Sequence, residues 1–203
     1  MAGEPKVKAL LLSGGIDSIC LAYWHRPALA VAITIDYGQK SANAEIVASK
    51  AVCDSLQIRH RVIKADCSAL GKGDMSNNGN AVLSQCTEWW PYRNQLLITL
   101  GCMAIIETGI SELLIGTVLS DKRHRDGTKE FIKTIRTLVC QQEGGIVISA
   151  PGLELTTTDL VIQSQVPASF LSWAHSCHTS NTPCGNCNGC NKHLEVMLAL
   201  GLG

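Results

Sequence analysis

Short apolar runs alternate with longer amphipathic stretches along most of the chain. Five apolar runs are typical of buried strands, at residues 7–12, 30–35, 61–65, 112–115 and 146–149. Between and after them, apolar positions recur at helical spacing, over residues 17–25, 42–56, 94–107, 128–142 and 156–165. Strands that alternate with helices predict an α/β fold with a parallel sheet covered by helices on both faces.

The chain reads as one domain over residues 1–203, because it contains no internal repeat and no long linker. We expect Asn94 to cap the helix that starts there. The polar, glycine-rich residues 71–80 predict a mobile loop. Ligands bind at the carboxyl ends of parallel strands, so residues 13–18 and 36–39 are expected at a ligand site.

Charge and hydropathy argue against two classes of protein, duplex nucleic-acid binders and membrane-spanning proteins. The formal net charge is zero, with 17 basic and 17 acidic residues, so the chain lacks the basic footprint of a duplex nucleic-acid binder. Residues 122–125 form either a local basic patch or a solvated loop. No apolar stretch approaches the roughly 18 residues of a membrane span, and the first residues, MAGEP, have no signal-like core. We therefore expect a cytoplasmic protein.

The segment SGGIDS, residues 13–18, follows the first predicted strand and begins the first helix. Gly14 and Gly15 let backbone N–H groups approach an anion, the helix start is electropositive, and Ser13 and Ser18 add hydroxyls. The segment lacks the lysine of a GxxxxGK[ST] loop. It therefore suits a pyrophosphate that leaves when an acid attacks the α-phosphorus of ATP, giving an acyl adenylate. A tight turn without a ligand is the alternative.

Four of the ten cysteines, Cys177, Cys184, Cys187 and Cys190, fall within residues 177–190. Without a secretory signal, such clustering favours a metal over disulfides. Four thiolates suit a closed, structural Zn²⁺ site, with an iron–sulfur cluster as the alternative. The nearby histidines are interpreted as bystanders: His175, His178 and His193. The remaining cysteines are expected to be inert core residues: Cys20, Cys53, Cys67, Cys86, Cys102 and Cys140.

SGGIDS matches the SGGxDS signature of the PP-loop ATP pyrophosphatases, which split ATP to AMP and pyrophosphate, normally with Mg²⁺. With the cysteine motif, DYGQ (36–39), WPYRN (90–94) and RDGTKEF (125–131), nearly the whole chain resembles the 7-cyano-7-deazaguanine synthase family of the queuosine pathway. The resemblance implies a Rossmann-like fold of the adenine nucleotide alpha hydrolase type. It also implies a C-terminal zinc knot and a possible homodimer.

The resemblance implies an ATP-dependent carbon–nitrogen ligase. Its substrate would be 7-carboxy-7-deazaguanine, whose carboxylate is adenylated, after which ammonia displaces AMP to give an amide. A second activation would convert the amide to the nitrile. The implied cofactors are ATP, Mg²⁺ and Zn²⁺.

Matching motif positions assign roles to individual residues. The phosphates of ATP would be held by Ser13, Gly14, Gly15, Asp17 and Ser18, with Asp17 also at Mg²⁺. Asp36 and Tyr37 would line the nucleotide end of the cleft. Arg93 and Asn94 would contact the phosphates or the acid, and Asp126 would accept hydrogen bonds from the guanine-like edge.

Some positions depart from the family pattern around the expected acid pocket. Thr128 stands where an arginine is expected, residues 152–160 lack an expected lysine, and Trp89, Trp90 and Tyr92 surround Pro91. The reaction could therefore stop at the amide, or the adenylate could be captured by a protein amine. The latter would conjugate deazaguanine to a partner protein, as in bacterial antiviral systems.

The aromatic residues near Pro91 suit docking of a polypeptide tail, stacking on a base or core packing. A zinc-knuckle RNA-binding module is a further alternative. Neutral charge and few aromatic residues argue against it.

Overall fold

A single parallel sheet forms the centre of the molecule. The computed structural model describes residues 7–79, 83–84 and 86–202. Its five strands run in the order β3-β2-β1-β4-β5, and every neighbouring pair is parallel. Their bounds are β1 Lys8–Leu11, β2 Leu29–Asp36, β3 Arg59–Lys64, β4 Glu112–Leu114 and β5 Val147–Ser149.

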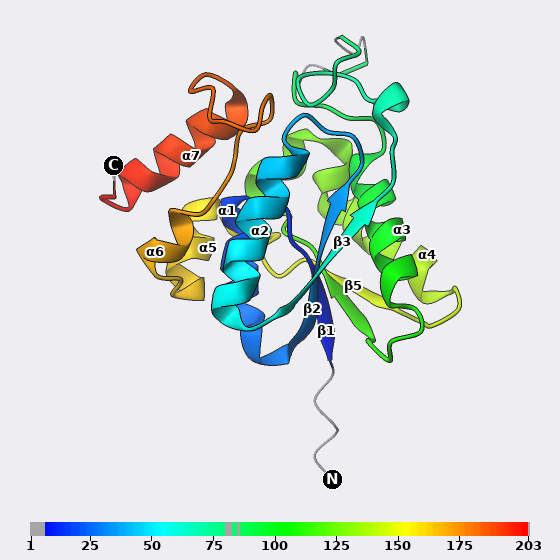
Figure 1. Cartoon of the computed structure of the whole chain (residues 1–203). Helices are drawn as coiled ribbons and strands as arrows, with labels where there is room; N and C mark the ends of the chain where they lie inside the picture. The colour runs from blue at the N-terminus through cyan, green and yellow to red at the C-terminus, as the bar shows by residue number, and fades with distance from the viewer. Residues whose placement is uncertain (1–6, 80–82, 85, 203) are drawn as a thin grey trace.

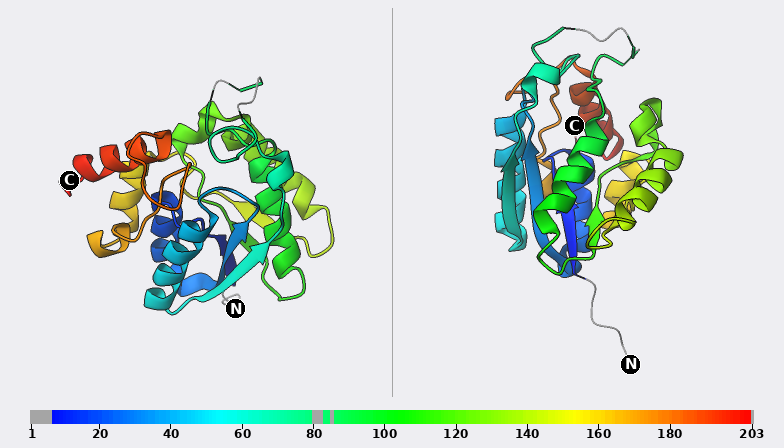
Figure 2. Two further views of the ribbon diagram at one scale, coloured as in Figure 1. Left: turned by 45° about the horizontal axis from the view of Figure 1, so that its top comes forward. Right: turned by 90° about the vertical axis from the view of Figure 1, so that its right-hand side faces the viewer.

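Helices cover both faces of this sheet (Figure 1). The described residues form α1 Ile16–His25, α2 Ala42–Leu56, α3 Arg93–Ile105, α4 Lys129–Cys140, α5 Thr157–Ser164, α6 Ala168–Leu171 and α7 Asn188–Ala199. Short 3₁₀ turns lie at Arg26–Ala28, Ser68–Leu70, Leu119–Arg123 and Arg125–Gly127. The views in Figure 2 show α1, α2, α5 and α6 on one side of the sheet and α3 and α4 on the other.

Alternating side chains of β1 explain these two layers. Leu10 is fully buried in the core cluster that includes residues of α1, α2 and α5. Its two neighbours face a second core cluster, which includes residues of α3 and α4. Ala9 belongs to this cluster, and Leu11 packs against it. Successive strand residues point to opposite faces of a sheet, so a strand apolar on both faces needs helices on both.

The predicted fold class is confirmed, including the parallel sheet and its two helical layers. Each predicted strand lies at its apolar run, and the helix predicted at residues 42–56 has those bounds. The prediction that Asn94 caps a helix is wrong, because α3 begins one residue earlier and its cap is Tyr92, with a left-handed φ of 54°. Helices α6 and α7 were not predicted.

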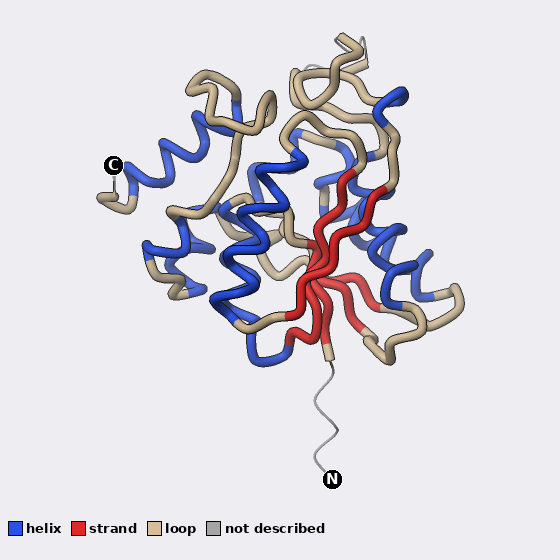
Figure 3. Tube along the Cα trace, in the orientation of Figure 1, coloured by secondary structure: helices blue, strands red, loops and turns tan. Residues whose placement is uncertain are grey.

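The strand order reverses between β1 and β4, which favours ligand binding at the carboxyl ends of these two strands. The long segments before α3 and before α7 both extend beyond this end of the sheet (Figure 3). In the first of them Met75 and Ser76 are buried, whereas Asn80, the end of the predicted mobile loop, lies outside the described residues. No helix in the described ranges has the length and apolar character required to cross a bilayer.

Candidate active site and metal centre

A cavity of about 270 Å³ lies at the carboxyl ends of β1, β2 and β4. It brings together segments that are far apart in sequence: the loop after β1, the start of α3, and the chain that precedes and begins α7. The predicted site residues that line it are Ser13, Gly15, Asp17, Ser18, Tyr37, Arg93, Asn94 and Cys177. Gly14, Asp36 and Asp126 are not among the lining residues.

Gly14 shapes the loop from behind the cavity. Its φ is +74°, a conformation that L side chains rarely adopt, and a Cβ there would lie 2.9 Å from both the Glu45 carbonyl oxygen and the Ala48 Cβ. Its carbonyl accepts a hydrogen bond from the His175 N–H at 2.9 Å. The loop is therefore held between α2 and the segment that leads to the cysteine cluster.

The two serines of the loop turn toward each other. The hydroxyl oxygens of Ser13 and Ser18 are 3.3 Å apart, and Ser18 also donates to the Gly15 carbonyl at 2.9 Å. Gly15 is the N-cap of α1 and offers no side chain to cap the helix. The electropositive start of α1 is thus available to an anion that enters the cavity.

Asp17 is the acidic residue in the first turn of α1. Its Oδ2 forms an ion pair with Lys192 Nζ at 2.8 Å, whereas its Oδ1 is buried without a hydrogen-bond partner among the described residues. Burial raises the pKa of the Asp17 carboxyl, and Lys192 and, more weakly, the nearby Thr157 hydroxyl oppose that rise. A carboxylate oxygen without a hydrogen-bond partner among the described residues, in the wall of the cavity, suits a hard cation such as Mg²⁺.

The turn after β2 is held by its own side chains. Asp36 Oδ1 accepts the Gly38 N–H at 3.1 Å, and Gln39 Oε1 accepts the Tyr37 N–H at 2.9 Å. Tyr37 is buried and meets Trp90 edge-on, with ring centroids 4.8 Å apart. Burial raises the pKa of Tyr37, so its phenol stays neutral.

The start of α3 is tied to the turn that contains Asp126. Asn94 donates its backbone N–H to Asp126 Oδ2 at 3.0 Å and its side-chain amide to the Asp126 carbonyl at 2.8 Å. Burial on its own would lower the pKa of Arg93, but the nearby carboxylates, Asp126 first among them, raise it above its ordinary value. A charged guanidinium therefore faces the cavity, and Asp126 positions the helix that carries it.

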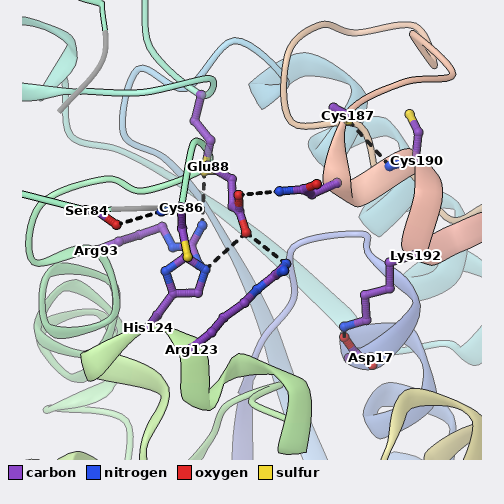
Figure 4. A network of polar contacts seen from close by, with 12 residues as sticks. Asp17, Ser84, Cys86, Glu88, Arg93, Arg123, His124, Cys187, Cys190 and Lys192 are labelled. Atoms are coloured by element: carbon purple, nitrogen blue, oxygen red, sulfur yellow. Dashed lines mark hydrogen bonds and ion pairs between the residues drawn. The ribbon is translucent and has the colours of Figure 1, made fainter. Parts of the chain in front are cut away.

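Glu88 is a buried carboxylate that sequence reasoning missed. Its oxygens contact Arg123 Nη2 at 2.8 Å, His124 Nε2 at 3.3 Å and Asn188 Nδ2 at 2.7 Å (Figure 4). Burial would raise the pKa of Glu88, but hydrogen bonds to its own backbone N–H and to Asn188, with the charge of Arg123, bring it below the usual value. Arg123 and His124, from the basic run at residues 122–125, therefore point toward Glu88. The sequence had suggested a basic patch or a solvated loop for this run, and neither interpretation included an inward contact with a carboxylate.

Cys86 lies beside this network. Ligand atoms of Cys86, Glu88 and His124 all lie within 4.8 Å of one another, as they would around a metal ion. The guanidinium of Arg123 already neutralises the Glu88 carboxylate. We therefore describe this group as an ion-pair network.

The aromatic residues near Pro91 divide between core and surface. Trp90 is buried against Tyr37, whereas Tyr92 is 77% exposed. Neither they nor Trp89 occur among the described residues that line the cavity. Core packing therefore accounts for Trp90.

The four clustered cysteines converge as a tetrahedral site requires. All four sulfurs lie within 4.8 Å of one another, with Cys184 and Cys190 at 3.9 Å and Cys177 and Cys187 at 4.0 Å. A Zn–S bond of about 2.3 Å in tetrahedral geometry places sulfurs about 3.8 Å apart. Cys187 Sγ accepts the backbone N–H groups of His178 and Cys190, each at 3.4 Å, so two backbone donors orient this sulfur. The donor set therefore fits Zn²⁺.

The three nearby histidines belong to the cavity wall. His175 Nε2 contacts the Ser180 carbonyl at 3.0 Å, and His193 Nδ1 contacts the Ser176 hydroxyl at 3.1 Å. Burial lowers the pKa of His178 to about 4, so its imidazole is neutral at pH 7. Over the described ranges, no histidine joins the four-cysteine group.

Comparisons with known proteins agree with the resemblance. A sequence model of the family described as "Queuosine biosynthesis protein QueC" matches residues 8–200. The 7-cyano-7-deazaguanine synthase of Methanosarcina barkeri is 28% identical, over 95% of this chain and 94% of the relative. Those of Methanosarcina mazei and Porphyromonas gingivalis strain W83 are 23% and 25% identical, over 95% and 97% of this chain and 94% of each relative.

Proposed function

Because the chain belongs to the family of queuosine biosynthesis protein QueC, we propose that it activates 7-carboxy-7-deazaguanine with ATP and converts it to 7-cyano-7-deazaguanine. The relatives named above are synthases of that nitrile and match this chain nearly end to end. The enzyme would be an AMP- and pyrophosphate-forming carbon–nitrogen ligase.

One observation carries the proposal: a single cavity joins a helix start without a side-chain cap, an acidic residue with one oxygen that has no hydrogen-bond partner among the described residues, and the half-buried Arg93. A carboxylate has no good leaving group, and adenylation supplies one. The carboxylate oxygen bonds to the α-phosphorus while the bond from that phosphorus to pyrophosphate breaks. Charge that grows on the pyrophosphate is then stabilised by positioned donors and cations.

The roles follow from these contacts. The loop residues Ser13, Gly14, Gly15 and Ser18 would hold phosphate oxygens, and Asp17 Oδ1 would hold Mg²⁺, which supplies positive charge to them. Arg93 would bind the phosphates or the acid.

The remaining predicted residues act around this centre. Asn94 and Tyr37 line the cavity, while Asp36 shapes the turn after β2 through Gly38. Asp126 is proposed as a positioning residue for α3 rather than a direct contact to the base.

The cysteine cluster would bind one Zn²⁺ with Cys177, Cys184, Cys187 and Cys190. Four protein thiolates leave no open position for a substrate, so the metal would be structural. It would fix the segment that leads into α7, whose cap is Cys187.

The test is ATP–pyrophosphate exchange with purified, zinc-replete protein. Exchange that requires both 7-carboxy-7-deazaguanine and Mg²⁺ is expected, and its absence would refute acid activation. Mass spectrometry after addition of ammonia then identifies the product, because the amide has lost one acid oxygen and the nitrile both. Adenylate formation with neither product, but with a mass increase on an added protein, would show conjugation instead.

A further inference from the structure

A lysine from the far end of the chain supplies the cation that the loop after β1 lacks. Lys192 Nζ lies 2.8 Å from Asp17 Oδ2, and both side chains are largely buried, with 31% and 18% exposed. Lys192 lines the same cavity as Ser13 and Ser18. Figure 4 shows it reaching from α7 toward the first turn of α1.

Helix α7 is built to bring this side chain into the cavity. Asn188 and Lys192 are four residues apart, so they project from one face of the helix. Each bonds to a carboxylate of the cavity wall: Asn188 Nδ2 to Glu88 Oε2 at 2.7 Å, and Lys192 to Asp17. Gly189 lies between them, and its ideal Cβ position is only 1.9 Å from the Ser176 carbonyl oxygen. This close approach presses the helix start against the cavity wall.

On the basis of the proposed function, we propose that Lys192 is a catalytic residue that binds the departing pyrophosphate. An ammonium group has three donors, and the ion pair with Asp17 uses one of them. When the substrate carboxylate bonds to the α-phosphorus, the electron pair of the broken P–O bond goes to the oxygen that had joined the α- and β-phosphorus atoms, which becomes a terminal oxygen of the departing pyrophosphate. Lys192 stabilises this charge electrostatically, and no proton is transferred in the step.

The contacts of the two Asp17 carboxylate oxygens indicate that Lys192 does more than neutralise the charge of Asp17. Lys192 pairs with Oδ2, while Oδ1 is buried without a hydrogen-bond partner among the described residues. The carboxylate therefore has one oxygen for the lysine and one for a cation that accompanies phosphates. Such a pair would hold Lys192 in place before ATP enters.

The experiment compares Lys192→Met with Lys192→Arg and with Lys129→Met as the matched control. Lys129 also forms an ion pair, with Glu154 at 2.6 Å, but on the surface of α4 and outside the cavity. The first measurement is the Kd of inorganic pyrophosphate with Mg²⁺ by calorimetry. We expect Lys192→Met to raise this Kd by roughly 10- to 100-fold, as loss of a charge-assisted hydrogen bond should, and Lys129→Met to leave it unchanged.

The second measurement is substrate-dependent ATP–pyrophosphate exchange. Lys192→Met should slow it by about 10²- to 10³-fold, the cost of one transition-state donor. Lys192→Arg, which keeps the charge, should restore pyrophosphate binding in part, even if the methionine variant folds poorly. If Lys192→Met binds pyrophosphate as tightly as wild type, Lys192 has no such role, although the proposed function would stand. If the wild type neither binds pyrophosphate nor exchanges it, both proposals fail.

Discussion

Replacement of Gly14 by alanine tests the geometry of the loop at residues 13–18. Two costs are expected. An L residue at φ +74° costs about 1–2 kcal/mol. The new Cβ would also lie 2.9 Å from the Glu45 carbonyl oxygen and from the Ala48 Cβ, and such overpacking typically costs about 1–3 kcal/mol.

Gly109→Ala is the matched control. Gly109 has the same φ of +74°, but its Cβ would meet no described atom within 4 Å. The difference between the two variants therefore isolates the contact with α2, at about 1–3 kcal/mol. In a chain of 203 residues, this corresponds to roughly 2–12 °C in Tm.

The assay is thermal and urea unfolding of both variants, followed by the Kd of pyrophosphate. Gly14→Ala should be less stable than Gly109→Ala and should bind pyrophosphate more weakly, because the loop must move away from α2. Equal unfolding free energies would refute the claim that α2 closes the space behind Gly14. Lower stability with unchanged pyrophosphate binding would show that the loop at residues 13–18 is not part of the anion site.

Three further outcomes are expected. Glu88→Gln should lower the free energy of unfolding by about 1–3 kcal/mol at pH 7. Because folding depresses the pKa of Glu88, the wild type should lose this advantage as the pH falls from the usual pKa of 4.5 through the depressed pKa of the folded protein. Urea unfolding of both proteins at several pH values measures this loss. Cys184→Ser or a strong chelator should remove the single bound zinc, read by metal analysis, and lower Tm. Trp90→Ala should cost about 3–5 kcal/mol, whereas Tyr92→Ala, at a largely exposed position, should stay within about 0.5 kcal/mol in the same unfolding assay.

Local sequence patterns were sufficient to predict the strands of the sheet. A parallel strand covered on both faces is a continuous apolar run, and β2 is such a run, with five consecutive buried residues. The amphipathic pattern of residues 42–56 likewise gave the bounds of α2. The start of α3 was misjudged because Asn94 is a good cap by residue type, yet its side chain bonds to the Asp126 carbonyl.

The candidate site likewise contains residues that the sequence was enough to predict and residues that it was not. The loop at residues 13–18 and the cysteine cluster are compact motifs, so the sequence was enough to predict both as candidate sites. Lys192 and Glu88 carry no such signal, because their partners Asp17 and Asn188 lie 175 and 100 positions away. Only the folded chain brings these charges together.

Helix α7 explains why these two motifs occur in one chain. Cys187 and Cys190 lie at its start and bind toward the cysteine cluster, while Asn188 and Lys192 project into the cavity. The start of α7 therefore contributes side chains both to the cysteine cluster and to the cavity. A metal held by Cys187 and Cys190 would therefore also fix the distance from Lys192 to the loop after β1. Under the proposed function, this coupling gives a physical reason for a four-cysteine cluster next to the loop at residues 13–18.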